Sequence, residues 1–555
     1  MSKTRSVTLI AAVVLSPAAG VASAVPPDEE SKLTAWDGEA LDGFGNSVAI
    51  DGTTAIVGAQ GDDDGGTDAG AAYLYDISNP LKPSRLARLT ASDGIASDMF
   101  GRPVAIDGTT VLVGALSAEN GPHSGSAYLF DISNPGTPVE TKLVPSDGAE
   151  ADRFGSALAV SGTSALVGAH RDDDKGTDSG SAYLFDFSNP AAVTEAKFWA
   201  DDTAANDGFG RSVAAAGTLA VVGAWLDDDN GSNSGSAYLF DISDPAAPVQ
   251  LAKLTASNGA ADDYFGQSVA ISGNTIIIGA PFHAQNGNDS GCAYVYDISD
   301  PSNPVETALD PSDGAASDRF GHVVAINGTW GLVGALLSDD HGPSSGSAYV
   351  FDLSSPHAPA ENAKLMASDG AGGDYLGNSL GISGTTALVG APNDDDLGSS
   401  SGSAYLFDAN PPCAKSYCTT RTGSPKNKAT VSASSCDLLG DITLTMAGAI
   451  QGKFCCLMIG NGSGKVTDPP GAKGDLCLSG GDLLELYALD IGKTTGSGTF
   501  ALNISNSLSG GTGFGIPGGG GGQILSGDTW NFQFWYRAAY TKPSRYSEAI
   551  RVTFE

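Results

Sequence analysis

Runs of three consecutive aspartates occur at four places in the chain, and carboxylates at this spacing could hold a hard cation. In the stretch GAHRDDDKGTDSG, Asp172 to Asp174 are followed by Gly176 and Asp178. Calcium takes six to eight oxygen ligands, and alternate side chains of an extended chain point to the same side. Asp172, Asp174 and Asp178 are therefore candidate calcium ligands. The equivalent candidates in the other copies are Asp62, Asp64, Asp68, Asp227, Asp229, Asp394 and Asp396.

A second interpretation of the same aspartates requires no metal. Asp side chains accept hydrogen bonds from backbone N–H groups in tight turns and keep such turns solvated. Three further copies of the segment are weaker in acid: LSAENGPHSG, PFHAQNGNDSG and LLSDDHGPSSG. Both interpretations remain open on the sequence, and no cofactor other than calcium is indicated.

The aspartate runs belong to a unit that is repeated seven times. A Phe-Gly pair, replaced by Leu-Gly in the last copy, recurs every 54 to 56 residues, and Gly-Ala begins fourteen residues after the start of each pair. Each unit contains four short apolar runs bounded by turn residues, as at 154–160, 163–169 and 180–187, with a fourth such as 252–257. These runs predict an all-β fold, a seven-bladed β-propeller built from four-stranded blades.

The two ends of the repeat array predict a closed ring. The last unit stops after 402–409 and lacks its fourth strand, whereas SKLTAW at 31–36 is a fourth strand with no blade before it. Pairing these two segments would leave no sheet edge exposed.

Phe-Gly followed by Gly-Ala in seven copies resembles the FG-GAP repeat of the integrin α-subunit head and its bacterial relatives. The resemblance covers 32–409. It implies that each phenylalanine packs between blades and that the glycines allow close backbone approach. Integrin-like units hold calcium in a D-x-D-x-D-G loop between the first and second strands. Here those loops are short turns such as 51–54, so the family's calcium site is not carried over to them.

The acidic segments are expected to lie on one face of the propeller. Loops between second and third strands emerge beside the blade-to-blade segments, which are acidic too, as at 146–155 and 312–321. Loops on a rigid scaffold usually carry function. We therefore expect a non-catalytic binding or adhesion module whose acidic face takes a protein or carbohydrate partner. A passive scaffold whose acids only provide solubility is the alternative, and an extracellular hydrolase is a third.

No catalytic residues are predicted. The six histidines form no H-x-x-x-H pair, and no G-x-S-x-G motif or phosphate-binding loop occurs. The serine of GSAYLF recurs in five copies, which indicates a structural role. Cys292 takes the same position and is predicted to be a small buried thiol. Paired carboxylates of a glycoside hydrolase are not excluded, because acids are frequent everywhere.

The N-terminus and the composition indicate an exported protein. Lys3 and Arg5, the apolar run 7–15 and the small residues 22–24 predict a signal peptide at 1–24. The net charge of −36 repels nucleic acid and anionic lipid. No segment is long and apolar enough to span a bilayer. We expect a secreted or surface-exposed monomer.

The composition changes after Asp408, so the propeller is assigned to 25–409 and a C-terminal β domain, sandwich-like, to 410–555. Its six cysteines, at 413, 418, 436, 455, 456 and 477, are predicted to form disulfides, with a four-thiolate zinc site as the alternative. The aromatic residues at 530–536 fit a sandwich core or, alternatively, a surface that stacks on carbohydrate.

Overall fold

A computed structural model describes residues 29–117 and 124–410 in full. Beyond them it describes the backbone of the strands β29–β40, between Ala414 and Thr553. Pro26–Asn410 form one compact unit, and Pro411–Glu555 fall in a second. The predicted signal peptide lies outside the described residues, and so do the side chains of the six C-terminal cysteines.

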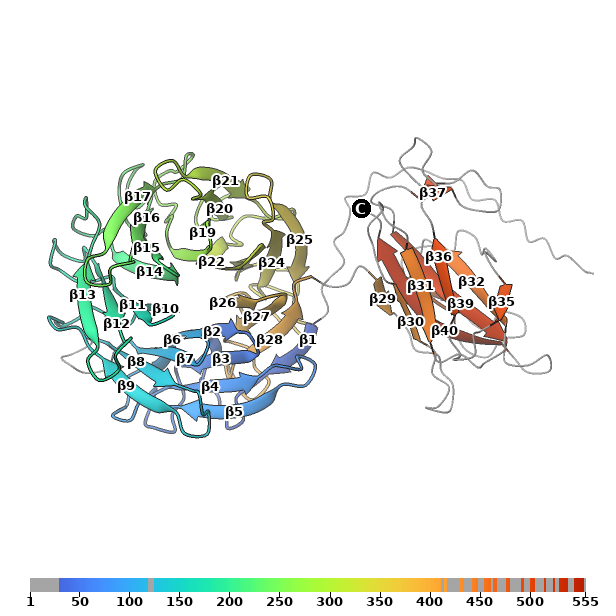
Figure 1. Ribbon diagram of the computed structural model, residues 1–555, viewed down its shortest axis with the longest axis horizontal. Coiled ribbons are helices and arrows are strands. Elements are labelled where there is room, and N and C mark those ends of the chain that lie inside the picture. The colour runs from blue at the N-terminus through green and yellow to red at the C-terminus, as the bar shows by residue number, and fades with distance from the viewer. Residues whose placement is uncertain are drawn as a thin grey trace, which may run out of the picture. The chain divides into compact units, whose positions relative to one another are not determined.

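The fully described part of the chain forms seven antiparallel sheets of four strands, arranged as a closed ring (Figure 1). The predicted seven-bladed propeller is confirmed. The strands of blades 1 to 3 are β2 (Phe44–Asp51), β3 (Thr54–Ala59), β4 (Ala71–Asp76), β5 (Ser84–Leu89); β6 (Phe100–Asp107), β7 (Thr110–Ala115), β8 (Ser126–Asp131), β9 (Val139–Leu143); β10 (Ala157–Ser161), β11 (Ser164–Ala169), β12 (Ser181–Asp186) and β13 (Thr194–Phe198). Those of blades 4 to 7 are β14 (Phe209–Ala216), β15 (Leu219–Ala224), β16 (Ser236–Asp241), β17 (Val249–Leu254); β18 (Ser268–Ser272), β19 (Thr275–Ala280), β20 (Cys292–Asp297), β21 (Val305–Leu309); β22 (Phe320–Asn327), β23 (Trp330–Ala335), β24 (Ser347–Asp352), β25 (Ala360–Leu365); and β26 (Ser379–Ser383), β27 (Thr386–Ala391), β28 (Ser403–Asp408) and β1 (Glu29–Leu33).

The sequence of each strand follows from its place in the blade. In β3 every residue after Thr54 is buried, because the second strand is covered on both faces, and this explains its continuous apolar run. The outer strand β5 is largely exposed or half-buried. Cys292, at the start of β20, is fully buried, and burial raises the pKa of its thiol, so the predicted buried thiol is confirmed.

The Phe-Gly pair joins neighbouring blades, as the resemblance implied. Phe100 is buried in a cluster that includes Leu74 of the preceding blade, and its ring packs edge-on against Tyr128 at 5.5 Å between centroids. Gly101 has φ of +98°, and its carbonyl oxygen lies 2.0 Å from where a Cβ on Gly58 would be. Any side chain at Gly58 would therefore force the two blades apart.

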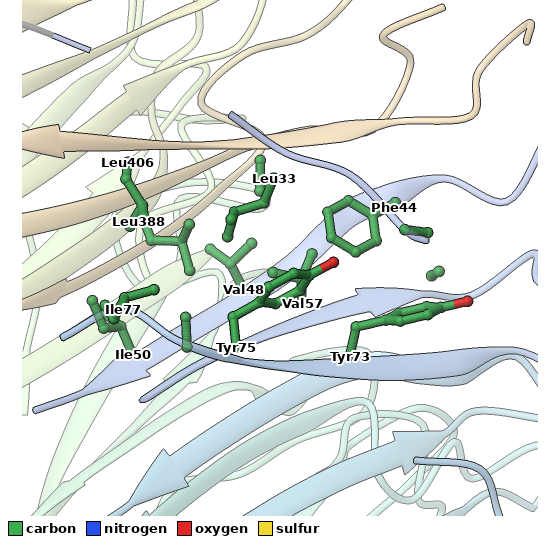
Figure 2. Close-up of a cluster of buried hydrophobic side chains, with 14 of the residues drawn as sticks. Leu33, Phe44, Val48, Ile50, Val57, Tyr73, Tyr75, Ile77, Leu388 and Leu406 are labelled. Atoms are coloured by element: carbon green, nitrogen blue, oxygen red, sulfur yellow. The ribbon is translucent and has the colours of Figure 1, made fainter. Parts of the chain in front are cut away.

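The ring is closed by the N-terminal strand, as predicted. β1 pairs antiparallel with β28 of the last blade, with Lys32 opposite Tyr405 and Leu33 opposite Ala404. Figure 2 shows Leu33 in one buried cluster with Phe44 of blade 1 and with residues of blade 7.

The fourth strands end earlier than the sequence suggested. β1 stops at Leu33 rather than at residue 36, and β17 spans Val249–Leu254 rather than 252–257. Each of these two strands ends at a buried leucine, Leu33 in β1 and Leu254 in β17. The chain then turns towards the next blade, where Trp36 packs edge-on against Tyr73 at 4.8 Å between centroids.

The C-terminal segment is described as strands only. A five-stranded sheet has the order β29 (Ala414–Ser416), β40 (Ser544–Thr553), β39 (Thr529–Arg537), β32 (Phe454–Gly460), β35 (Ile491–Lys493). A three-stranded sheet contains β30 (Thr430–Ala433), β31 (Ile442–Ala447) and β36 (Phe500–Ile504). Two short hairpins are β33 (Ser463–Val466) with β34 (Leu476–Ser479), and β37 (Phe514–Gly515) with β38 (Gln523–Ile524). The sandwich, the disulfides and the role of the aromatic residues stay predictions.

Candidate functional site

The loop between β11 and β12 shows what the aspartates do. Asp172 is only 2% exposed; its Oδ1 accepts the N–H of Asp174 at 3.0 Å, and its Oδ2 accepts the hydroxyl of Tyr183 at 3.1 Å. The Oδ1 of the exposed Asp173 accepts the N–H of Asp178 at 2.7 Å. The loop is thus a tight turn whose Asp side chains cap backbone N–H groups, as the second interpretation predicted. Its first aspartate, however, is buried rather than solvated.

A lysine lies at the point where the carboxylates of this loop converge. Lys197 Nζ is 2.7 Å from Asp172 Oδ2, 2.7 Å from Asp174 Oδ2 and 2.8 Å from Asp147 Oδ2 of the preceding blade-to-blade segment. Asp172 and Asp174 therefore converge as predicted, but on an ammonium group of the same chain. Asp178 is not part of this set of contacts. Its carboxylate lies 4.0 Å from Arg171 Nε.

Equivalent clusters recur around the ring at the same register. Lys253 of β17 lies opposite Tyr238, as Lys197 lies opposite Tyr183. The distances from its Nζ are 2.8 Å to Asp202, 3.1 Å to Asp227 and 2.5 Å to Asp229. In blade 7, Lys32 Nζ is 3.0 Å from Asp369, 2.9 Å from Asp394 and 2.5 Å from Asp396. In blade 1, Arg88 pairs with Asp62, with Asp64 at 3.2 Å and with Asp37 at 3.6 Å. We call these four groups the ion-pair clusters.

The blade without a cation also lacks the acids. In β21, Ala308 lies opposite Tyr294 at the lysine register. The three positions that hold aspartates in the ion-pair clusters are Asn258, His283 and Gln285 in this blade, so none of them is an acid. In blade 2, by contrast, Lys142 keeps one described acid, Asp93, at 2.7 Å. In blade 6, Lys364 keeps Asp313 at 2.8 Å and Asp340 at 2.5 Å. At the two loop positions that converge on the cation, acids thus occur only in blades whose fourth strand carries a cation, whereas blade 2 has Lys142 but Ala118 and Asn120 at these positions.

The protonation equilibria agree with ion pairing. Burial opposes the charge on Lys197, but its hydrogen bonds to Asp147, Asp172 and Asp174 hold the pKa of the ammonium above its usual value. Burial likewise raises the pKa of Asp147, yet the hydrogen bonds from Lys197 and Tyr183 bring that pKa below its usual value. Both groups therefore carry full charge near neutral pH.

The cation of the fourth strand was missed by sequence reasoning. It stands fourteen or fifteen residues after the tyrosine of AYLF, followed in most copies by leucine, as at Lys142-Leu143 and Lys253-Leu254. A search for this recurring pair of a basic residue and a leucine could have identified the cation of the fourth strand. The Asp–Lys contact itself spans 25 residues, from Asp172 to Lys197, so local spacing does not show it.

Two buried aspartates of the blade-to-blade segments predict an unusual pH dependence of stability. Asp42 and Asp207 are 4% and 8% exposed and accept backbone N–H groups at 2.7 and 2.6 Å. Burial, reinforced by nearby carboxylates, raises the pKa of each to about 6. The folded state therefore binds these protons more tightly than the unfolded chain, whose Asp pKa is about 3.9. Stability should rise as the pH falls from above 6 towards 4.

We expect the melting temperature to be a few degrees higher near pH 5 than near pH 7.5 at constant ionic strength. The variant carrying Asp42→Asn and Asp207→Asn keeps one side-chain oxygen at each position to accept the backbone N–H. Differential scanning calorimetry of this variant should show a smaller rise in melting temperature. A smaller rise is still expected in the variant, because protonation of the other carboxylates reduces the net negative charge of both proteins at low pH. An equal rise in both proteins would contradict the assignment to these two carboxyl groups.

A closed ring of seven four-stranded blades defines the chain as a seven-bladed β-propeller. The FG-GAP repeat model matches it seven times, at 27–75, 83–130, 138–185, 193–240, 248–296, 305–351 and 359–407. The chain therefore belongs to the FG-GAP repeat family. Each matched segment begins near the fourth strand of one blade and ends in the third strand of the next. The first of these fourth strands, β1, completes the last blade. A model of the LVIVD repeat also matches at 294–308. No curated protein matches the chain.

Proposed function

We propose that the propeller is a non-catalytic binding module of an exported protein and that a partner contacts its loop face, the face formed by the β3–β4-type loops and the blade-to-blade segments. The observation that carries the proposal is the way the loops are built. Their first aspartates are buried and bonded, so the exposed carboxylates next to them, such as Asp173, Asp228 and Asp395, are held in fixed positions. Rigidly presented charge favours a specific partner with a complementary surface.

Export is supported by the predicted signal peptide and agrees with the described part of the chain, in which no helix is long and apolar enough to cross a membrane. The expected partner is a protein or a carbohydrate. Basic groups on that partner would match the exposed carboxylates.

The rival function, glycoside hydrolysis, needs a carboxylic acid whose pKa is raised so that it can donate a proton. The exposed carboxylates of the ion-pair clusters have the opposite environment. Lysine holds the pKa of Asp147, Asp202 and Asp369 below the usual value, although burial acts against it. Asp42 and Asp207 do have a raised pKa, but both are buried in turns.

The test compares two matched pairs of charge-neutralising variants. Asp228→Asn with Asp395→Asn changes the loop face and keeps the oxygen that accepts the N–H of Asn233 or Ser400. Asp244→Asn with Asp300→Asn changes the turns after β16 and β20, which belong to the opposite face. Asn189 is the equivalent residue of blade 3 and accepts the same type of backbone hydrogen bond, so Asn fits these turns. Both pairs remove two charges.

We expect at least one member of a panel of glycans and basic extracellular proteins to bind the mature chain, more tightly at low than at high salt. The loop-face variant should bind it about threefold or more weakly, as for exposed charge pairs. The variant with Asp244→Asn and Asp300→Asn, in the turns of the other face, should bind the partner as tightly as the wild type. Absence of any binder, or equal losses in both variants, would contradict the proposal.

A further inference from the structure

The centre of the ring differs in charge from the rest of the protein. The first strands of the blades border it (Figure 1). A cavity of about 300 Å³ there is lined in every blade by the residue that follows the Phe-Gly or Leu-Gly pair. These seven residues are Asn46, Arg102, Ser156, Arg211, Gln267, His322 and Asn378. All are polar and none is acidic, in a chain with 64 acidic and 28 basic residues. Because the seven positions are structurally equivalent, the fold does not dictate which side chain each one holds.

A second cavity, of about 260 Å³, continues this centre towards the loop face. It shares Arg102, Ser156 and Arg211 with the first cavity and adds Arg153 and Arg171. Arg153 comes from the segment before β10, and Arg171 from the β11–β12 loop. Four arginines of blades 2 to 4 thus line one cavity, which we call the arginine pocket.

The four arginines of the pocket have one nearby counter-ion among the described residues. Among the described residues, no carboxylate lies within ion-pair distance of Arg102, Arg153 or Arg211, and Asp178 is the one acid in the wall, 4.0 Å from Arg171. The lysines of the ion-pair clusters, by contrast, have three acids each. Although the chain has more acidic than basic residues, only one acidic side chain lines this pocket among the described residues.

The arginines also act on one another. Burial, together with the smaller effect of the charges of Arg102 and Arg153, lowers the pKa of Arg211 to about 10. His170 adds no charge, because burial and then the neighbouring arginines lower its pKa to about 3. Like charges gathered in a partly desolvated cavity are unfavourable, and an anion between them would offset this cost.

The wall offers further groups that suit a polar ligand. The indole Nε1 of Trp225 is buried and has no hydrogen-bond partner, and the guanidinium of Arg211 lies 5.1 Å from the Trp225 ring centroid. This contact orients Arg211 and leaves its N–H groups free for an acceptor. Guanidinium groups bind planar or tetrahedral oxyanions through paired hydrogen bonds.

We propose that the arginine pocket binds an oxyanion, a carboxylate, sulfate or phosphate group of a small ligand. The volume suits a ligand below drug size. The exposed aspartates of the surrounding loop face would repel a long polyanion, so we expect compact anions to bind and DNA or heparin to bind no better than a single sulfate group. This site is separate from the exposed carboxylates of the loop face, and either proposal can fail without the other.

The test uses the mature full-length chain and three probes: sodium sulfate, sodium phosphate and sodium tartrate. Each is compared with sodium chloride at equal ionic strength, since screening alone stabilises so acidic a chain. We expect at least one probe to raise the melting temperature saturably, by about 3 °C or more at a concentration roughly 100 times its Kd. Calorimetric titration should give one site per chain. The probe with the highest affinity identifies the class of oxyanion.

Two matched variants locate the site. Arg153→Gln with Arg171→Gln removes two charges from the exposed mouth of the pocket, and Lys82→Gln with Arg85→Gln removes two from the outer strand β5 and its turn. The first variant should lose the saturable shift while melting in chloride at or above the wild-type temperature, because repulsion is relieved. The second should keep the shift. The proposal is overturned if no probe exceeds chloride, if the pocket variant keeps the shift, or if heparin binds far more tightly than sulfate.

Discussion

Removal of the residues up to Trp36 is expected to open the ring and to lower the melting temperature by about 10 °C or more. The deletion takes away β1, whose backbone pairs with β28, and leaves the edge of β28 exposed. It also removes Leu33, which is 3% exposed, at a cost of about 2 kcal/mol. Finally it removes Lys32, the cation bound to the buried Asp394, and an unpaired buried charge costs about 3–5 kcal/mol.

The control is a shorter deletion that ends before Glu29 and spares β1. It should melt like the mature chain in differential scanning calorimetry. A synthetic peptide covering 27–38 should restore part of the lost stability of the longer deletion, because it can pair with β28 again. An unchanged melting curve after the longer deletion would show that β1 does not hold the ring closed.

The fold could be predicted because each feature occurs seven times. A single Phe-Gly pair carries little information, but a constant offset of fourteen residues between Phe44 and Gly58, and between Phe100 and Gly114, requires one shared packing arrangement. Gly58 shows the physical reason, since its missing side chain is what allows contact with Gly101 of the next blade. Ring closure followed from the same repetition.

The candidate site was harder to predict because its parts are brought together only by the sheet register. The aspartate triplets are visible as a local pattern, and that pattern is compatible with calcium binding as well as with a turn. The lysine that faces these carboxylates lies opposite Tyr183 on the fourth strand, and that pairing exists only in the folded blade.

The arginine pocket was missed for the opposite reason. The residues after the Phe-Gly pairs, such as Arg102 and Arg211, differ from copy to copy, so they look like variable positions of a repeat. Their common location emerges only when seven blades surround one centre.

We propose that the ammonium groups of the fourth strands occupy the places that calcium would take in these loops, so the wild-type chain should show no specific calcium binding. Calcium should raise its melting temperature no more than sodium at equal ionic strength. In blade 4 the oxygens of Asp202, Asp227 and Asp229 lie within 4.8 Å of one another, a spacing that suits a cation once Lys253 is removed.

Lys253→Met should therefore have two effects. Asp227 is 4% exposed and would lose its cation, which should destabilise the fold by about 3–5 kcal/mol. Calcium should then recover part of this loss by binding the three free carboxylates of the folded state. The triple variant Lys253→Met, Asp227→Asn, Asp229→Asn keeps only Asp202 of the three carboxylates and approaches blade 5, where Ala308 stands opposite Tyr294 and the two loop positions carry no acid. It should be more stable than Lys253→Met and should not respond to calcium. If calcium instead stabilises the wild type as strongly as Lys253→Met, the lysine does not exclude the metal, and the aspartate triplets are cation ligands after all.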